Sequence, residues 1–325
     1  MPNKWFVTGG AGFIGSHLVE RLLGRGDGVV VLDDLSTGRR ANLVAATAHA
    51  GFEFVEGSVT DRALVASLVA RADRVIHLAA AVGVRLIVDE PVRTLETNIH
   101  GTEVILKECA RRGTPVFVAS SSEVYGKGSR CPFTEDDDVL LGPTTKSRWS
   151  YAASKMVDEF LALSYHKERG LPARVGRFFN TVGPRQVGQY GMVLPRFIGQ
   201  AQDGGPITVY GDGAQSRTFA HVTDVVESVV RLMDTDATAG QVFNIGGVEE
   251  VTIQRLAERV RALVDPRVEI RHVPYEEAYG GGFEDLGRRV PDTSRLERAT
   301  GFTPRRRLDE ILADTVAHLA AERRA

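Results

Sequence analysis

Short apolar runs alternate with longer amphipathic segments through the first half of the chain. The apolar runs are typical of strands buried on both faces, and they predict strands at residues 5–7, 29–32, 52–55, 74–78, 116–119 and 173–178. The segments between them predict helices at residues 16–25, 62–70, 94–111 and 151–169. Strands and helices that alternate this regularly indicate an α/β fold with a doubly wound parallel sheet.

The regular alternation ends after Phe179, and a smaller, loop-rich part follows. Its pattern predicts strands at 207–210 and 242–245, and helices at 193–202, 225–233, 252–264 and 308–323. Three consecutive glycines at 280–282 predict a flexible break. We expect a sheet domain at residues 1–179 plus roughly 214–247, and a smaller C-terminal domain at 180–213 and 248–325 that covers the carboxyl edge of the sheet.

Composition narrows the class of protein. Hydrophobic residues make up 43% of the chain and charged residues 25%, and the net charge is −2, so nothing indicates a nucleic-acid partner or a membrane surface. Neither the cysteines, Cys109 and Cys131, nor the histidines, such as His77 and His221, show metal-ligand spacing, so we expect free thiols and no metal. Because the first strand begins at Trp5 and no apolar run reaches the length of a membrane span, we expect a cytoplasmic protein.

Three glycines, Gly9, Gly12 and Gly15, lie between the first predicted strand and the first predicted helix. Glycine at such a junction lets the pyrophosphate of a dinucleotide approach bare backbone amides at a helix N-terminus. The next strand ends in Asp33, whose carboxylate is placed to accept hydrogen bonds from the adenosine ribose and disfavours a 2′-phosphate. These features predict a Rossmann-type sheet that binds NAD rather than NADP.

Other residues near this motif are candidates for cofactor binding. They are Phe13 and Ile14 within the glycine motif, Ser36 and Gly38 after Asp33, and Leu78, Ala79 and Ala80 at the end of the fourth strand. The alanines leave room for the backbone to pass under a bound cofactor.

Tyr151 and Lys155 are four residues apart, so on a helix their side chains lie on one face. Tyrosine alone is a poor base near neutral pH, but a neighbouring ammonium favours the phenolate. The pair is therefore a candidate for moving a proton to or from a sugar hydroxyl and for contacting the cofactor. Ser121, Ser122 and Glu123 follow the strand at 116–119, which aims two hydroxyls and a carboxylate into the cleft where open α/β sheets bind ligands.

The chain resembles the extended short-chain dehydrogenases/reductases. The features that carry the resemblance occur in the order of that family: the glycine motif, the acid after the second strand, the serine-rich strand end and the Tyr151/Lys155 pair. That family comprises NAD-dependent nucleotide-sugar epimerases, dehydratases and decarboxylases. The stretches FFNTVGPR, VYGDGAQSRTFAHVTDV and FNIGG extend the resemblance over essentially the whole chain. The resemblance implies NAD as cofactor, a UDP-sugar substrate bound by the smaller domain, and a homodimer formed through helices near 94–111 and 151–169.

Three features separate the branches of this family. Ser122 stands where the 4,6-dehydratases carry the aspartate that acts as the acid for water loss. Glu123 stands where 4-epimerases usually carry a small residue. Arg148, three residues before Tyr151, and Arg289, in the stretch RRVPD, resemble positions of the UDP-glucuronic acid decarboxylases.

The resemblance therefore implies NAD-dependent decarboxylation of UDP-glucuronic acid through a 4-keto intermediate, which yields UDP-xylose, UDP-4-keto-pentose or both. It assigns proton removal from the sugar C4 hydroxyl to Tyr151, activated by Lys155 and hydrogen-bonded through Ser121. It places Glu123 and Arg289 around the sugar C5 and the carboxylate, where they assist protonation after CO₂ leaves.

The same resemblance supplies a set of substrate-binding residues. Asn180, Arg185 and Arg217 match positions that approach the sugar nucleotide in relatives, and Arg148 and Arg289 complete the set. The planar fork of the Arg217 guanidinium suits the diphosphate, because it pairs with phosphate oxygens bidentately.

Two other functions stay open. A UDP-hexose or UDP-hexuronate 4-epimerase shares every feature except the loss of CO₂, and Glu123, Arg148 and Arg289 favour the decarboxylase over it. A non-catalytic NAD-binding sensor belongs to a different class, and such a protein has no need of the Tyr151/Lys155 pair.

Overall fold

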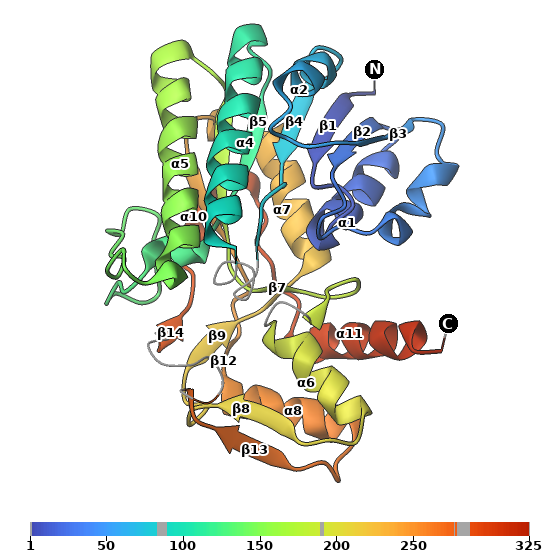
Figure 1. Ribbon diagram of the computed structural model, residues 1–325, viewed down its shortest axis with the longest axis vertical. Coiled ribbons are helices and arrows are strands. Elements are labelled where there is room, and N and C mark those ends of the chain that lie inside the picture. Colours follow the sequence, from blue (N-terminus) through green and yellow to red (C-terminus); the bar gives the residue numbers. More distant parts are fainter. Residues whose placement is uncertain (1, 83–89, 189–191, 276, 278–286, 325) are drawn as a thin grey trace.

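A seven-stranded parallel sheet forms the centre of the larger part of the molecule (Figure 1). Its strands follow the spatial order β11 (Val242–Ile245), β6 (Ala173–Phe178), β5 (Val116–Ser121), β4 (Arg74–His77), β1 (Lys4–Thr8), β2 (Gly28–Asp33) and β3 (Phe52–Glu56). All neighbouring strands pair in parallel. The prediction of a doubly wound parallel sheet is therefore confirmed.

The computed structural model describes every residue except 1, 83–89, 189–191, 276, 278–286 and 325. The flexible break predicted at residues 280–282 lies outside the described residues.

Helices cover both faces of the sheet (Figure 1). On one face lie α1 (Phe13–Leu23) and α7 (Val222–Asp234), which contact each other. On the other face lie α2 (Arg62–Val69), α4 (Pro91–Arg112) and α5 (Ser150–Arg169). Because both faces are covered, the strands carry the nearly continuous apolar runs from which they were predicted.

Strand β1 shows how one run supplies two cores. Trp5 and Val7 join the core beneath α1 and α7, whereas Phe6 between them joins the core beneath α4 and α5. Successive side chains of a strand point to opposite faces, so a strand covered on both sides has no position for an exposed polar residue.

The smaller part of the chain has its own hydrophobic core. Its helices are α6 (Val193–Gln202), α8 (Ile253–Val264) and α11 (Leu308–Glu322). Its strands form two small sheets: β8 (Ile207–Tyr210) beside β13 (Ile270–Val273), and β9 (Ser216–Thr218) between β12 (Glu250–Thr252) and β14 (Arg288–Arg289). A further pair, β7 (Thr181–Val182) with β10 (Ala220–His221), lies where the two parts of the chain meet.

Short 3₁₀ helices occur in the connections, at η1 (Arg40–Leu43), η2 (Ala46–Ala48), η3 (Ser122–Tyr125), η4 (Ser147–Trp149) and η6 (Asp236–Thr238). Helix α10 (Ser294–Thr300) lies within the stretch 248–325 but contacts α7 and β11 of the sheet. The division into two domains at the predicted residues stays a prediction. Over the described part of the chain, none of the helices combines the length and the apolar character that crossing a membrane requires.

A buried ion pair fixes α5 against β6. Arg177 Nη2 lies 2.7 Å from Glu159 Oε2, and each of the two side chains is 7% exposed. Ser120 Oγ at the end of β5 donates to Glu159 Oε1 at 2.5 Å. Loss of either charge from a buried pair typically costs about 3–5 kcal/mol, so this pair holds the helix in one register. The start of α5, with Tyr151 and Lys155, is thereby held beside the end of β5.

Candidate active site

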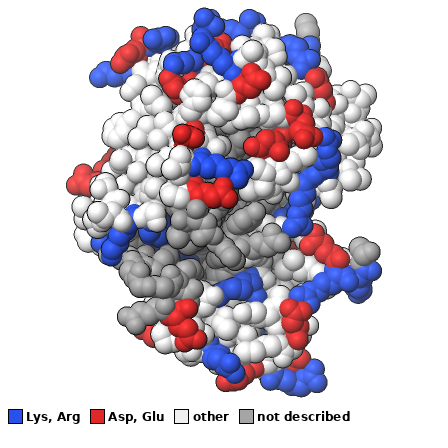
Figure 2. All heavy atoms as spheres, viewed as in Figure 1, with Lys and Arg blue, Asp and Glu red and all other residues white. Residues whose placement is uncertain are grey.

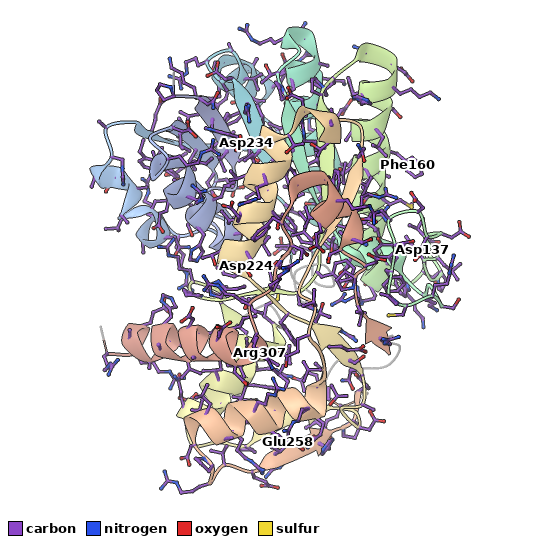
Figure 3. The ribbon with its side chains drawn as sticks, turned by 180° about the vertical axis from the view of Figure 1, so that it is seen from behind. Asp137, Phe160, Asp224, Asp234, Glu258 and Arg307 are labelled. Carbon is purple, nitrogen blue, oxygen red and sulfur yellow. The ribbon has the colours of Figure 1, made fainter. Side chains whose placement is uncertain are left out.

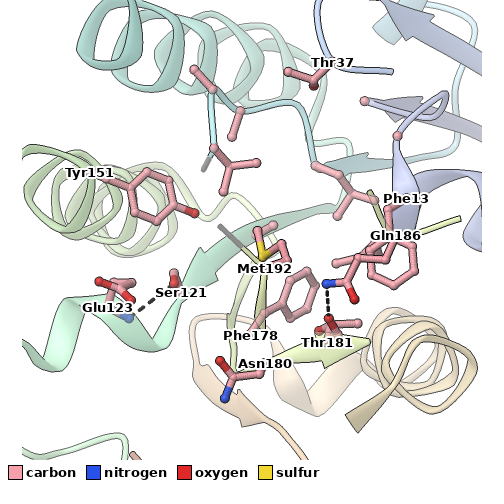
Figure 4. Close-up of a pocket in the computed structure, with 18 of the residues that line it drawn as sticks. Phe13, Thr37, Ser121, Glu123, Tyr151, Phe178, Asn180, Thr181, Gln186 and Met192 are labelled. Carbon is pink, nitrogen blue, oxygen red and sulfur yellow. Dashed lines mark hydrogen bonds between the residues drawn. The ribbon is translucent and has the colours of Figure 1, made fainter. Parts of the chain in front are cut away.

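A cavity of about 500 Å³ lies at the carboxyl edge of the sheet (Figure 4). Its lining comes from the turn between β1 and α1, the ends of β2, β4 and β5, the first turns of α5, and α6, β9 and β14 of the smaller part. Open parallel sheets bind their ligands at this edge. Across the described residues of the face in Figure 2, charged side chains of both signs are interspersed, which suits a small-molecule site better than a polyanion surface.

The glycine turn fits a phosphate group. Gly9 has φ +71°, and a Cβ on it would lie 2.7 Å from the backbone nitrogen of Ala79. A Cβ on Gly15 would lie 2.1 Å from the Gly9 carbonyl oxygen, so both positions require glycine. Gly12 is the N-cap residue of α1 and lines the cavity. Because glycine has no side chain to accept a hydrogen bond from the first amides of the helix, those amides are open to a ligand.

Asp33 is fixed by the backbone around it. Its Oδ2 accepts from the Ala11 amide and its Oδ1 from the Leu35 amide, each at 2.9 Å. Burial raises the pKa of Asp33, and these two amides partly oppose the rise. A Cβ on Gly38 would lie 2.8 Å from Asp33 Oδ1, so Gly38 makes room for this carboxylate and does not itself line the cavity.

The remaining predicted cofactor residues line the cavity. They are Phe13, Ile14, Ser36, Leu78, Ala79 and Ala80, together with Tyr151 and Lys155. Bare amides for a pyrophosphate and a fixed carboxylate for a ribose therefore occur in one cavity, in the arrangement that a dinucleotide such as NAD requires.

Tyr151 lies in the first turn of α5 and faces the end of β5 (Figure 4). Ser121 lies at the strand end that Tyr151 faces, and its Oγ accepts from the Glu123 amide at 3.2 Å. A hydrogen bond between Ser121 and Tyr151 stays a prediction. The pKa of Tyr151 is raised, first by burial and then by the negative charge of Glu123, and the nearby Ser121 hydroxyl opposes this only in part.

The predicted activation of Tyr151 by Lys155 stays a prediction. Lys155 Nζ lies 3.1 Å from Asp158 Oδ2, and both groups are buried. A carboxylate one turn further along α5 thus faces this ammonium, and burial and nearby carboxylates raise the pKa of Tyr151. The spacing of Tyr151 and Lys155 gave no sign of this third residue.

Glu123 is held between two arginines. Arg148 Nη1 lies 2.5 Å from Glu123 Oε2, and Arg289 Nη1 hydrogen-bonds to Glu123 Oε1. Burial alone would raise the pKa of Glu123, but the Arg289 and Arg148 guanidiniums outweigh it and lower that pKa to about 2. The two guanidiniums therefore keep this carboxylate ionised near neutral pH in the structure, and its expected assistance with protonation at C5 stays a prediction.

The other predicted substrate residues divide into two groups. Asn180, Arg217 and Ser122 line the cavity, and Asn180 Oδ1 accepts from Arg289 Nη2 at 2.9 Å. Arg185 does not line the cavity.

Arg185 Nη2 lies 2.6 Å from Glu20 Oε1 of α1, and the residue adopts φ +70°. The Arg185 guanidinium is thus directed to Glu20 of α1 in the structure, and the substrate-binding role predicted for it stays a prediction.

Sequence reasoning missed several residues of the cavity. Arg196 of α6 lies over the Tyr210 ring, with Cζ 3.9 Å from the ring centroid, and both line the cavity with Gln215 and Tyr275. Tyr210 and Gln215 belong to the stretch VYGDGAQSRTFAHVTDV, so a signal was present for them. Arg196 and Tyr275 belong to no motif.

Comparison with known proteins agrees with this site. Residues 5–246 match the model of the NAD dependent epimerase/dehydratase family. A UDP-N-acetyl-alpha-D-glucosaminuronate decarboxylase of Bacillus cytotoxicus is 40% identical over 317 residues, which cover 97% of each chain. UDP-glucuronic acid decarboxylase 1 of Arabidopsis thaliana is 37% identical over 311 residues, which cover 96% of this chain and 68% of the relative.

A solved structure is similar over the same length. The UDP-glucuronic acid 4-epimerase of Bacillus cereus, in complex with UDP-glucuronic acid and NAD, superimposes with a TM-score of 0.88 at 26% identity, covering 98% of this chain and 99% of that one. The predicted resemblance to NAD-dependent nucleotide-sugar enzymes is confirmed, and the chain belongs to the NAD-dependent epimerase/dehydratase family.

Proposed function

We propose that this protein decarboxylates a UDP-hexuronic acid with NAD as cofactor, and that UDP-glucuronic acid is the substrate and UDP-xylose, UDP-4-keto-pentose or both are the products. The observation that carries the proposal is the buried cluster of Glu123, Arg148 and Arg289 beside Tyr151. We expect this cluster to face the sugar carboxylate, which is the group that decarboxylation removes. The two relatives named above are both decarboxylases.

Tyr151 begins the reaction by accepting the proton of the sugar C4 hydroxyl. A bound NAD would supply the hydride acceptor and donor for C4. We expect Ser121, at the adjacent end of β5, to hydrogen-bond to Tyr151 and to orient its oxygen toward the sugar. Lys155, Gly12 and Asp33 belong to the surface that holds the cofactor against the sheet edge.

Carbon dioxide leaves from the resulting 4-keto acid, in which the carboxylate is β to the ketone. The bond between C5 and the carboxylate carbon breaks, and its electron pair passes through C5 to the C4 oxygen as an enolate. Tyr151 and Ser121 stabilise that oxygen by hydrogen bonds. A proton then adds to C5 and gives the 4-keto-pentose, whose reduction at C4 with proton return from Tyr151 gives the xylose.

Glu123 acts in this scheme as a fixed anion. It orients the guanidinium of Arg289, which lines the cavity, toward the substrate carboxylate, and it keeps Arg148 in place beside Tyr151. Arg217 and Asn180 hold the sugar nucleotide from the smaller part of the chain.

The relatives favour two further candidates for the activity. The Bacillus cytotoxicus enzyme is named for a 2-acetamido sugar, so UDP-N-acetylglucosaminuronic acid is a second candidate substrate for the same chemistry. The Bacillus cereus structure is that of a 4-epimerase, which shares the fold and carries UDP-glucuronic acid and NAD. A non-catalytic NAD sensor is disfavoured by the buried Tyr151 and Lys155, which line the cavity together with Ser121.

We also propose that the protein works in the cytoplasm. Cys109 and Cys131 are both free thiols, which suits a reducing compartment.

The proposed activity is tested by proton NMR time courses of the protein with NAD⁺ and either UDP-glucuronic acid or the 2-acetamido analogue. We expect loss of CO₂ and growth of pentose signals with one of the two, and no reaction with Tyr151→Phe, which lacks the accepting oxygen. Formation of UDP-galacturonic acid with its carboxylate intact would identify a 4-epimerase. NAD binding without turnover of any sugar nucleotide would support the sensor.

Replacement of Asp33 tests the cofactor site. Asp33→Asn keeps the shape of the side chain but removes the charge, and we expect the Kd for NAD to rise roughly 10- to 100-fold, since hydrogen bonds to a charged group contribute about 1.5–3 kcal/mol. Isothermal titration calorimetry measures the change. The matched control is Asp61→Asn, because Asp61 caps α2 and does not line the cavity. Equal effects of the two substitutions would remove the ribose contact from Asp33.

Replacement of Glu123 tests the charge cluster. In Glu123→Gln the two guanidiniums lose their anion, and we expect decarboxylation to slow by roughly 100-fold or more, as for other preorganised electrostatic contacts. NAD affinity should stay unchanged, and Glu123→Asp, which keeps the charge, should retain more activity. A Glu123→Gln protein that turns over at the wild-type rate contradicts the assigned role.

A homodimer through α4 and α5 is our proposal for the assembly. Phe160 on the outer side of α5 is 64% exposed (Figure 3), and Val92 on α4 is 67% exposed, so a contact through these helices would bury two large apolar side chains. Phe160→Asp should convert the dimer into a monomer in light scattering, whereas Phe160→Leu should not. A wild-type mass of one chain would refute the dimer.

A further inference from the structure

A second buried carboxylate lies beneath the predicted catalytic pair. Asp158 follows Lys155 by three residues on α5, and its Oδ2 accepts from Lys155 Nζ at 3.1 Å. The Asp158 side chain is fully buried and that of Lys155 is 4% exposed. Asp158 belongs to none of the motifs from which the site was predicted, and its pairing with Lys155 has no counterpart in the mechanism above.

The stability of the fold does not by itself explain why a carboxylate is buried at position 158. Burial raises the pKa of Asp158, and the Lys155 ammonium, followed by the Thr102 hydroxyl, opposes the rise. Within the described residues, Asp158 Oδ1 has no well-formed hydrogen bond. A buried ion pair is often no more stabilising than apolar residues of the same size, and an incompletely satisfied carboxylate is costly. The position therefore suits a functional group better than a structural one.

Few other charges reach Asp158. From β4, His77 lies behind it: His77 Nε2 is 3.1 Å from Thr102 Oγ1 of α4, and its Nδ1 is 2.7 Å from Thr8 Oγ1. Burial first, and then the Lys155 charge, lower the pKa of His77 to about 3, so the ring is neutral.

On α5 itself the neighbouring carboxylate is Glu159, and it is neutralised by Arg177 of β6. Helix α4, which lies along α5 in Figure 1, contributes Thr102 and Asn98, and Asn98 donates to Ser154 at 3.1 Å. The Lys155 ammonium is accordingly the principal cation that faces Asp158 among the described residues.

The same carboxylate acts on Tyr151. Among the groups that change the pKa of Tyr151, burial comes first, Glu123 second, the opposing Ser121 hydroxyl third, and the negative charge of Asp158 follows. Glu123 is already matched by Arg148 and Arg289. Asp158 differs, because the cation it neutralises is the one expected to favour the phenolate.

We propose that Asp158 is a positioning residue that holds the Lys155 ammonium one turn below Tyr151 and thereby sets the pH range in which Tyr151 takes the proton of the sugar hydroxyl. The proposal rests on the proposed function for its role in turnover. Asp158 does not touch the reacting atoms and acts only through Lys155 and Tyr151.

The test is Asp158→Asn, which keeps the volume and removes the charge. The rate should rise with pH as Tyr151 loses its proton, and loss of a nearby anion makes the phenolate easier to form. The rising limb of kcat/KM should therefore move about 0.5–1 pH unit toward lower pH. The matched control is Glu168→Gln, which removes a charge from an exposed position of the same helix and should leave the limb unchanged.

A second measurement does not depend on turnover. In the NAD-bound protein with ¹³C at tyrosine Cζ, the Tyr151 resonance is assigned by its absence in Tyr151→Phe and is titrated in wild type and Asp158→Asn. We expect the same downward displacement of its midpoint. An unchanged or higher midpoint overturns the proposal, whereas a displaced midpoint without sugar turnover overturns only the proposed function. Should Asp158→Asn fail to fold, Asp158→Ala, which leaves space and no charge, carries the same expectation.

Discussion

The site depends on one buried carboxylate held by two arginines from distant parts of the chain. Glu123 follows β5 at the sheet edge, Arg148 precedes α5, and Arg289 belongs to β14 of the smaller part. In the small sheet, Arg289 pairs in register with Arg217 of β9, so the clamp also fixes the strand that carries a second cavity-lining arginine. Glu123 therefore joins three separate segments of the chain at the cavity, and loss of its charge would leave two guanidiniums without this anion.

The charges around Tyr151 oppose its ionisation more than they favour it. Burial and two carboxylates, Glu123 and Asp158, raise its pKa, and the nearby Ser121 hydroxyl opposes them in part. Each carboxylate also faces a cation, Glu123 the guanidiniums and Asp158 the Lys155 ammonium. The same two carboxylates thus place the cations of the cavity and disfavour the phenolate of Tyr151.

Much of the fold follows from the sequence because it is encoded locally. The bounds predicted for β6, β8, β11 and α6 coincide with those observed, since apolar runs and helical spacing act within a few residues. The sheet formed by β9, β12 and β14 was not predicted. Its strands have only two or three residues, which is too short for the alternation of apolar and polar residues to be recognised in the sequence. They also pair with strands that lie tens of residues away along the chain.

The residues of the site also differ in how far the sequence predicts them. Glycines at a phosphate turn and an acid at a strand end are required by backbone geometry, so Gly9, Gly15 and Asp33 are readable from their spacing. The ionisation of a side chain depends instead on counterions that the fold supplies. Arg185 matches a substrate position in sequence but pairs with Glu20 from the first helix, and Lys155 stands beside Tyr151 in sequence but faces Asp158. Residue type and spacing thus identify which groups meet in the cavity, whereas the sign of each charge effect follows only from the partners that tertiary structure brings within about 4 Å.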